Sequence, residues 1–281
     1  MNKLPKTKRI QVLNLLLEGV GIQPASRLTG VSTRTIQDLL KDAGEACKEF
    51  HDEQIRDIRI EERIEIDEMW AQTYCKEKNV PYAIAPPRTA GDCYCHMALD
   101  ATSKLILTYG VGKRRPIETY WVLKDLRKRI VGIPEFATDG YIPYTQYIPE
   151  VFGEDVPLAQ TIRRTKKVKV SGNPDMKNTD TTFVERLNLS LRMHIRRYNR
   201  KTNAYSKRVS ALWNHTHLFV TWYNFVRIHD TLGTTPAVAM GLCEEPCDLG
   251  LIVKLIEVRE PPPKKRGPYR KCRSKVIVNR Q

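Results

Sequence analysis

Residues 63–70 read RIEIDEMW, and apolar and polar side chains alternate in this run up to Asp67. Alternation with a period of two predicts a half-buried strand, here closed by Asp67. A second short run, EFATDGY at residues 135–141, predicts a strand that ends at Asp139, directly before a glycine. A carboxylate at the end of a strand is poorly placed for core packing and well placed for a site. The alternative is that each aspartate only caps a turn, as Asp often does.

The segments around these two runs indicate a mixed α/β core. A pair of strands is expected on either side of a turn at residues 100–103, and a further strand follows the one that ends at Asp139. The expected strands are Tyr94–Asp100, Leu105–Val111 and Leu158–Ile162. Apolar side chains at helical spacing predict helices at Pro116–Ile130, Thr182–Tyr198 and Ser206–Ile228.

The helix expected at Thr182–Tyr198 has one polar face that contains Glu185. With 100° per residue, Asn188, Arg192 and Arg196 fall within about 60° of Glu185, and the apolar residues lie mostly on the other side. For an isolated helix, such a polar face is most often an ordinary solvent-exposed surface. Together with two strand-end aspartates it favours a site, in which the two arginines bind DNA phosphates beside Glu185.

Three carboxylates from separate segments suit one kind of chemistry. Phosphodiester reactions need an activated oxygen nucleophile and a stabilised leaving oxygen, and two divalent cations about 4 Å apart supply both. Carboxylates are the ligands that hold such hard cations. Asp67, Asp139 and Glu185 are therefore candidate catalytic and metal-binding residues.

Residues 1–46 predict a helical head. After a first amphipathic helix, Pro24–Thr29 predicts a short helix, and a glycine turn leads to Ser32, which is placed to cap a helix at Thr33–Ala43. Two short helices joined by a glycine turn are typical of a helix-turn-helix, although a three-helix bundle without DNA is the alternative. The exposed face of the last helix supplies the candidate base-reading residues Thr33, Arg34, Gln37 and Asp38.

Charge points to the same class of partner. The chain has 47 Lys and Arg against 32 Asp and Glu, a formal net charge of +15, which favours a polyanion such as double-stranded DNA. A basic surface without a partner is the alternative. No apolar run is long enough for a membrane helix and no secretory segment is evident, so we expect a cytoplasmic protein without a membrane partner. The seven cysteines are expected to be reduced thiols rather than disulfides or a metal knuckle.

The C-terminal tail, residues 261–281, carries eight Lys and Arg and no acid, after three consecutive prolines. This composition predicts a structureless arm that binds DNA without sequence preference, with Lys264, Lys265 and Arg266 as candidate contacts. The expected organisation is thus a head (1–46), a linker (47–62), a catalytic domain (63–240), a helical or extended segment (241–260) and the basic tail (261–281).

At the carboxylates the sequence resembles DDE transposases of small bacterial insertion sequences, most closely the insertion-sequence-one group. The matching pieces, which lie within about residues 60–240, are Ile-Asp-Glu-Met-Trp around Asp67, Thr-Asp-Gly-Tyr around Asp139, Val-Glu-Arg-Leu-Asn around Glu185, residues 199–202 with 206–207, and residues 223–237. The resemblance implies a ribonuclease-H-like mixed-sheet core, with Asp67 on the first strand, Asp139 after the fourth and Glu185 on a following helix.

The same resemblance implies a transposase that uses Mg²⁺, as two ions for which Mn²⁺ can substitute. Water frees a 3′ hydroxyl at the element end, and that hydroxyl then attacks target DNA at the same site. The partners are element-end and target DNA, and a homodimer or larger assembly is expected on DNA. Two alternatives stay open: an inactive or domesticated transposase that acts as a DNA-binding regulator, and a nuclease that cuts without joining.

Overall fold

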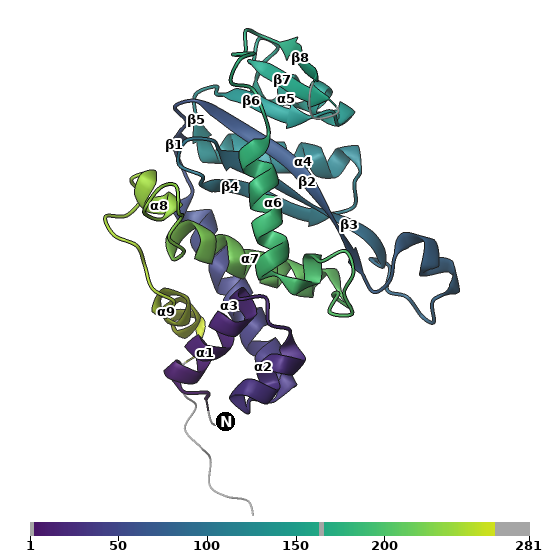
Figure 1. Ribbon diagram of the computed structural model, residues 1–281, viewed down its shortest axis with the longest axis vertical. Helices are drawn as coiled ribbons and strands as arrows, with labels where there is room; N and C mark the ends of the chain where they lie inside the picture. Colours follow the sequence, from purple (N-terminus) through teal and green to yellow (C-terminus); the bar gives the residue numbers. More distant parts are fainter. Residues whose placement is uncertain (1–2, 163–165, 262–281) are drawn as a thin grey trace, which may run out of the picture.

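A six-stranded mixed sheet forms the centre of the protein (Figure 1). The computed structural model describes residues 3–162 and 166–261. The strand order is β4-β3-β2-β6-β7-β8, in which β2 runs parallel to β6 and β6 parallel to β7, while the other neighbours are antiparallel. The strands of the sheet are β2 (Arg63–Thr73), β3 (Gly91–Asp100), β4 (Ile106–Gly112), β6 (Glu135–Asp139), β7 (Leu158–Ile162) and β8 (Lys166–Ser171). The short strands β1 (Ile58–Arg59) and β5 (Ile130–Val131) pair separately.

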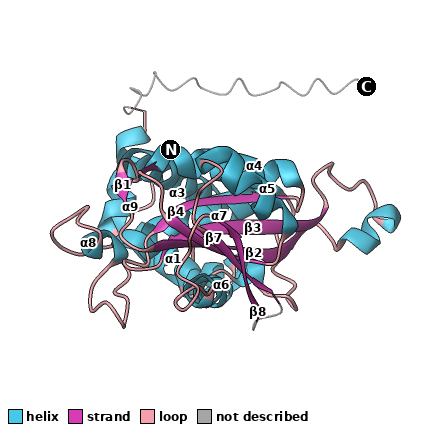
Figure 2. Ribbon diagram, turned by 90° about the horizontal axis from the view of Figure 1, so that it is seen from above, coloured by secondary structure: helices cyan, strands magenta, loops and turns pink. Residues whose placement is uncertain are grey.

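Helices cover both faces of this sheet (Figure 2). The helices α4 (Pro116–Arg129) and α5 (Ile142–Phe152) lie on one face, and α6 (Thr182–His194) packs against β2 and β3 on the other. Proline at the first turn of α4 fits there because that position needs no N–H donor. The remaining helices are α7 (Val209–Phe225), α8 (Pro236–Ala239), α9 (Gly250–Arg259) and the 3₁₀ turns η1 (Glu77–Tyr82) and η2 (Arg196–Tyr198).

The N-terminal head consists of α1 (Lys6–Leu17), α2 (Ile22–Thr29) and α3 (Thr33–Gln54). Ser32 caps α3 as expected, because its hydroxyl accepts a hydrogen bond from the Thr35 backbone N–H at 3.1 Å. The expected end of this helix near Ala43 is wrong. The helix continues through residues 47–54, in the segment expected to be a linker, because Cys47 and His51 are buried one turn apart on its inner face.

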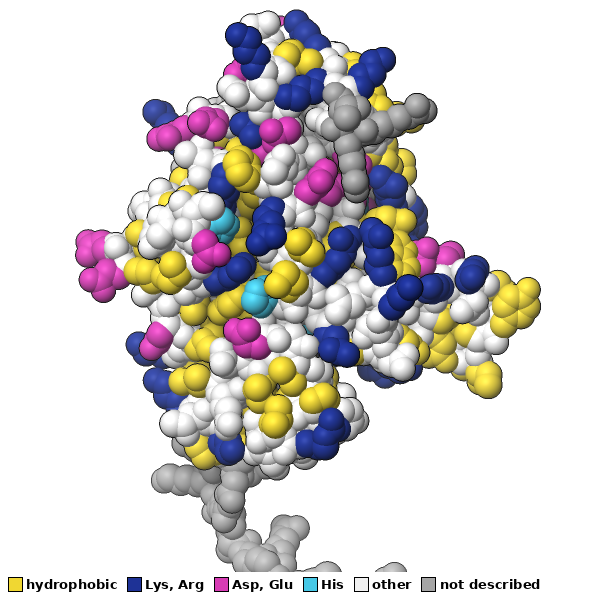
Figure 3. All heavy atoms as spheres, in the orientation of Figure 1, with side chains coloured by type: hydrophobic (Ala, Val, Ile, Leu, Met, Phe, Trp, Pro, Cys, Tyr) yellow, Lys and Arg dark blue, Asp and Glu magenta, His cyan; other side chains and the backbone are white. Residues whose placement is uncertain are grey.

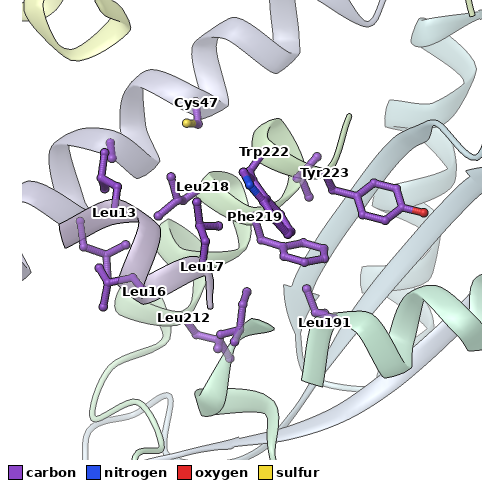
Figure 4. Close-up of a cluster of buried hydrophobic side chains, with 14 of the residues drawn as sticks. Leu13, Leu16, Leu17, Cys47, Leu191, Leu212, Leu218, Phe219, Trp222 and Tyr223 are labelled. Atoms are coloured by element: carbon purple, nitrogen blue, oxygen red, sulfur yellow. The ribbon is translucent and has the colours of Figure 1, made fainter. Parts of the chain in front are cut away.

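The head shares its core with the rest of the protein. Figure 4 shows Leu13 and Leu17 of α1 in one cluster with Leu212 and Phe219 of α7. The Leu17 carbonyl at the end of α1 is also bonded by the His194 ring, with 2.7 Å between Nδ1 and the oxygen. The described head is therefore packed into the sheet-bearing part of the chain, although the sequence predicted a separate unit.

Several element ends differ from the sequence-based expectations. The strand β2 runs six residues beyond Asp67, and α6 ends at His194 rather than Tyr198. Helix α5 was not expected, because Pro143 and Pro149 disguise its apolar spacing. Within residues 3–162 and 166–261, no helix has the length and apolar character needed to cross a membrane. The basic tail with Lys264, Lys265 and Arg266 lies outside the described residues.

Candidate active site

Two of the predicted carboxylates meet at the centre of the sheet. The parallel strands β2 and β6 pair up to Ile66 and Thr138, so Asp67 and Asp139 follow side by side in the same register. Their carboxylate oxygens lie within 4.8 Å of each other. Asp67 does not end its strand, which corrects the sequence-based expectation. Asp67 is half-buried, and it is open on one side because β6 stops at Asp139 while β2 continues beside β3.

A third carboxylate joins these two, and it is Glu68. One of its carboxylate oxygens lies within 4.8 Å of ligand oxygens of both aspartates. Its side chain is only 1% exposed, and its Oε2 accepts a hydrogen bond from Arg114 Nη2 at 3.1 Å. Its Oε1 has no hydrogen-bond partner among the described residues and lies 3.8 Å from Nδ1 of His96. The sequence reasoning missed Glu68, although it directly follows Asp67 in the quoted motif.

Among the described residues, Arg114 is the cation that pairs with this group. Its Nη2 lies 3.8 Å from Oδ2 of Asp139, and its guanidinium stands 4.2 Å from the ring centre of Tyr141. The Tyr141 backbone N–H in turn donates to Oδ1 of Asp139 at 3.0 Å. The Asp139 carboxylate is therefore fixed by the turn that follows its strand, and one arginine balances part of the negative charge.

Burial and mutual repulsion both raise the pKa values of these acids. Burial, and next the charge of Asp139, raise the pKa of Asp67 to about 6 and that of Glu68 to about 7. Burial also raises the pKa of Asp139 itself. Carboxylates with raised pKa values are under-neutralised in the folded protein, and a divalent cation would relieve this repulsion.

Glu185 lies in the first turn of α6 and faces the same site from the helix side. It is exposed, and its Oε1 accepts a hydrogen bond from the Thr181 hydroxyl at 3.2 Å. After burial, which is the larger cause, the Glu185 charge also contributes to the raised pKa of Asp67 and of Asp139. Glu185 is outside the group of carboxylates whose ligand atoms lie within 4.8 Å of one another. Its convergence with the two aspartates to within a few ångströms stays a prediction.

Two further side chains fix α6 against β2. Glu65 is fully buried, and its Oε2 accepts hydrogen bonds from the backbone N–H groups of Phe183 at 2.8 Å and Val184 at 2.9 Å. One turn further along, Asn188 Nδ2 donates to Oδ2 of Asp67 at 2.7 Å, while its buried Oδ1 has no partner among the described residues. Asn188 was placed on the site-facing side of this helix from the sequence, but Glu65 was taken as one polar residue in an alternating strand.

The candidate DNA-binding residues occupy two places. Arg34 and Gln37 of α3 line a cleft together with Arg196, and Asp38 pairs with Arg34 at 3.1 Å. Thr33, at the start of the same helix, is half-buried. Arg192 is half-buried on α6, where burial lowers its pKa, and its Nε has no partner among the described residues.

Comparison with known proteins gives little beyond this geometry. No family model matches the chain, and no curated protein matches its sequence. Among solved structures, the chain is similar to the Mos1 strand transfer complex, with 12% identity and a TM-score of 0.26 over 79% of each chain. It is also similar to the Mos1 transposase paired-end complex with left transposon end, with 11% identity and a TM-score of 0.24 over 79% of this chain and 78% of that one. Scores this low carry no argument about the family or chemistry of the chain.

Proposed function

We propose that this protein is a transposase that cuts DNA and transfers a 3′ hydroxyl into target DNA, with Asp67, Asp139 and Glu185 as its catalytic carboxylates. The observation that carries the proposal is the meeting of Asp67 and Asp139 from two adjacent parallel strands, with their carboxylate oxygens within 4.8 Å. Burial raises the pKa of both aspartates, so their charged forms are unfavourable in the protein without a cation. Such a cost is common where acids are gathered to hold a cation.

The donors in this site fit a hard divalent cation. All of them are oxygens: the two aspartates, Glu68, Glu185 from α6, and Oδ1 of Asn188, which has no hydrogen-bond partner in the described part of the chain. We infer Mg²⁺ as the cofactor, held as two ions, with Mn²⁺ able to replace it. When bound, the cations activate the attacking oxygen and stabilise the leaving oxygen. The protein's own part is to fix the carboxylates, through the Tyr141 N–H on Asp139 and Asn188 on Asp67.

The sheet order supports a ribonuclease-H-like core. Counted within the six-stranded sheet, Asp67 lies on the first strand in the chain, Asp139 ends the fourth, and Glu185 lies on a later helix. This is the arrangement that the resemblance to DDE transposases implies. The proposed partners are element-end and target DNA. The head supplies base contacts through Thr33, Arg34, Gln37 and Asp38, Arg192 and Arg196 supply phosphate contacts, and a dimer or larger assembly forms on DNA.

The test uses end-labelled duplex DNA that contains the sequence flanking the gene, incubated with the full chain and either Mg²⁺ or EDTA. We expect metal-dependent nicks at one position and, with a second duplex present, joined products of larger size. Nicks without joined products would favour a nuclease. Sequence-specific binding without any nick would favour a DNA-binding regulator, and either outcome would overturn the proposal.

A further inference from the structure

A cleft of about 1140 Å³ separates the head from the segment that follows α6. One wall is α3, which presents Arg34, Gln37 and Lys41. The opposite wall is residues 196–208 together with the start of α7, and it is strongly basic. Its cations are Arg196, Arg197, Lys201, Lys207 and Arg208, and no Asp or Glu lines the described cleft. The Lys and Arg side chains gathered over and beside α6 continue this basic surface on the same side of the protein (Figure 3).

The cations of the opposite wall have no acidic partners among the described residues, in contrast to those of α3. Arg34 pairs with Asp38, and Lys41 lies 3.8 Å from Glu45. Arg197 instead has a single neutral acceptor, the Ser206 hydroxyl at 2.8 Å. Burial lowers the pKa of Arg197 to about 10, so the charged form of this side chain is poorly solvated inside the protein. A wall of unpaired cations around one partly buried arginine is suited to an external anion.

We propose that this cleft holds the phosphate backbone of a DNA duplex whose major groove receives α3. The exposed face of α3, with Arg34 and Gln37, forms one wall of the cleft. A major groove is about 12 Å wide, so a helix inside it has a phosphate backbone close on either side. The 196–208 wall lies where one of these backbones passes. Base contacts and backbone contacts then come from parts of the chain far apart in sequence.

The cleft also lies at a fixed distance from the carboxylates, because α6 connects the two. From Glu185 to His194 this helix rises by about 14 Å, and Arg196 of the cleft follows directly. That length corresponds to about four base pairs of duplex. If the proposed function is right, the phosphates held in the cleft therefore lie at least about four base pairs from the bond that is cut. The spacing rests on the proposed chemistry, and the placing of α3 in a major groove rests on the base contacts of the proposed function.

The test compares two double variants of the full chain without any divalent metal. Lys201→Ala with Arg208→Ala removes two exposed cleft cations that have no partner among the described residues. Lys124→Ala with Lys128→Ala removes the same charge from α4, on the other face of the sheet. Binding to a random 30-base-pair duplex is measured by fluorescence anisotropy over a range of salt concentrations. The cleft variant should lose about 1.8 from the slope of log K against log salt, since each phosphate contact contributes about 0.9. The α4 variant should keep the slope of the unchanged protein.

Equal slopes for the two double variants would overturn the proposal, provided that both melt at the temperature of the unchanged protein. Because no metal is present and no cut is scored, a failure of the proposed chemistry would leave this result unaffected. Hydroxyl-radical footprinting on the DNA flanking the gene tests the spacing separately. Protection at least about four base pairs from the cut should be lost in the cleft variant only, and protection lost at the cut itself would contradict the spacing.

Discussion

The Glu65 carboxylate on β2 accepts a hydrogen bond from the Val184 backbone N–H at 2.9 Å, one residue before Glu185. The same oxygen accepts from the Phe183 N–H, so one buried side chain satisfies two of the free donors at the start of α6. The other Glu65 oxygen accepts from Arg63 at 3.0 Å. Glu65 contacts no reacting group. It nevertheless fixes the first turn of α6 against β2, and hence the position of Glu185 relative to Asp67.

We predict that Glu65→Gln lowers both stability and cleavage. The neutral amide holds the helix N-terminus more weakly and turns a donor toward Arg63, so the free energy of unfolding should fall by about 1–3 kcal/mol. Cleavage at a temperature where the variant is folded should also fall, because α6 is no longer fixed. The control is Glu61→Gln, an exposed residue with no ion pair among the described residues, which should change neither quantity. A variant that loses stability but keeps full cleavage would show that Glu65 does not position Glu185.

Asp139→Asn should abolish both cleavage and joining while leaving DNA binding largely intact. Asn keeps the shape of Asp but loses the anion that holds a hard cation, and a loss of about a thousandfold corresponds to about 4 kcal/mol of transition-state stabilisation. The proposed DNA contacts lie in the head and in the basic cleft, away from this charge. The measurement scores nicked and joined products from labelled DNA, with Asp155→Asn as an exposed control. Near-normal joining of pre-cut ends by Asp139→Asn would exclude a shared site.

The sequence located most of the sheet and two of the clustered carboxylates, since alternation and strand ends are local signals. It predicted β7 at its observed bounds and Ser32 as the cap of α3. It could not show that β2 continues past Asp67, because the exposure of that residue depends on where the neighbouring strand β6 stops. The sequence reasoning missed Glu68 for the same reason. Its carboxylate can reach Asp139 only because β6 ends at that residue, so that beyond Ile66 the described part of β2 pairs with β3 but no longer with β6.

The stabilisation by a divalent cation should depend on pH. Folding raises the pKa of Asp67 from 3.8 to about 6 and that of Glu68 from 4.5 to about 7. The folded protein therefore holds protons that the unfolded chain has released, and these groups lower the stability of the metal-free protein as pH rises from about 4 to 7. A cation binds the deprotonated forms. Thermal melts in Mn²⁺ and in EDTA should differ little at pH 5 and clearly at pH 8, and Asp67→Asn should remove the difference at pH 8. An equal gain at both pH values would contradict this.

Gly44→Ala should destabilise the head and the sheet-bearing part together. A Cβ at Gly44 of α3 would lie 2.5 Å from the Asn214 Cα of α7, so the two helices would have to separate. Overpacking of this kind costs about 1–3 kcal/mol. Because the head shares its hydrophobic cluster with α7, the melting curve should shift as a single transition. Glu53→Ala on the exposed side of α3 should leave the curve unchanged. Two separate transitions, of which only one moves, would show that the head folds alone, as the sequence suggested.

Glu68→Gln should weaken cation binding although Glu68 is absent from the three acids expected from the sequence. Its carboxylate lies in the tight group with Asp67 and Asp139, whereas Glu185 lies outside that group. Its side chain is 1% exposed and accepts a hydrogen bond from Arg114, so this carboxylate is already held in place beside the two aspartates. Mn²⁺ binding to the DNA-free protein, measured by calorimetry, should therefore weaken by about tenfold, or about 1.4 kcal/mol, in Glu68→Gln. Glu185→Gln should have a smaller effect, because the exposed Glu185 side chain must move toward the two aspartates before it can bind the same cation. Should Glu185→Gln weaken Mn²⁺ binding while Glu68→Gln leaves it unchanged, Glu68 would serve only to hold Arg114, and the ligands would be the three acids expected from the sequence.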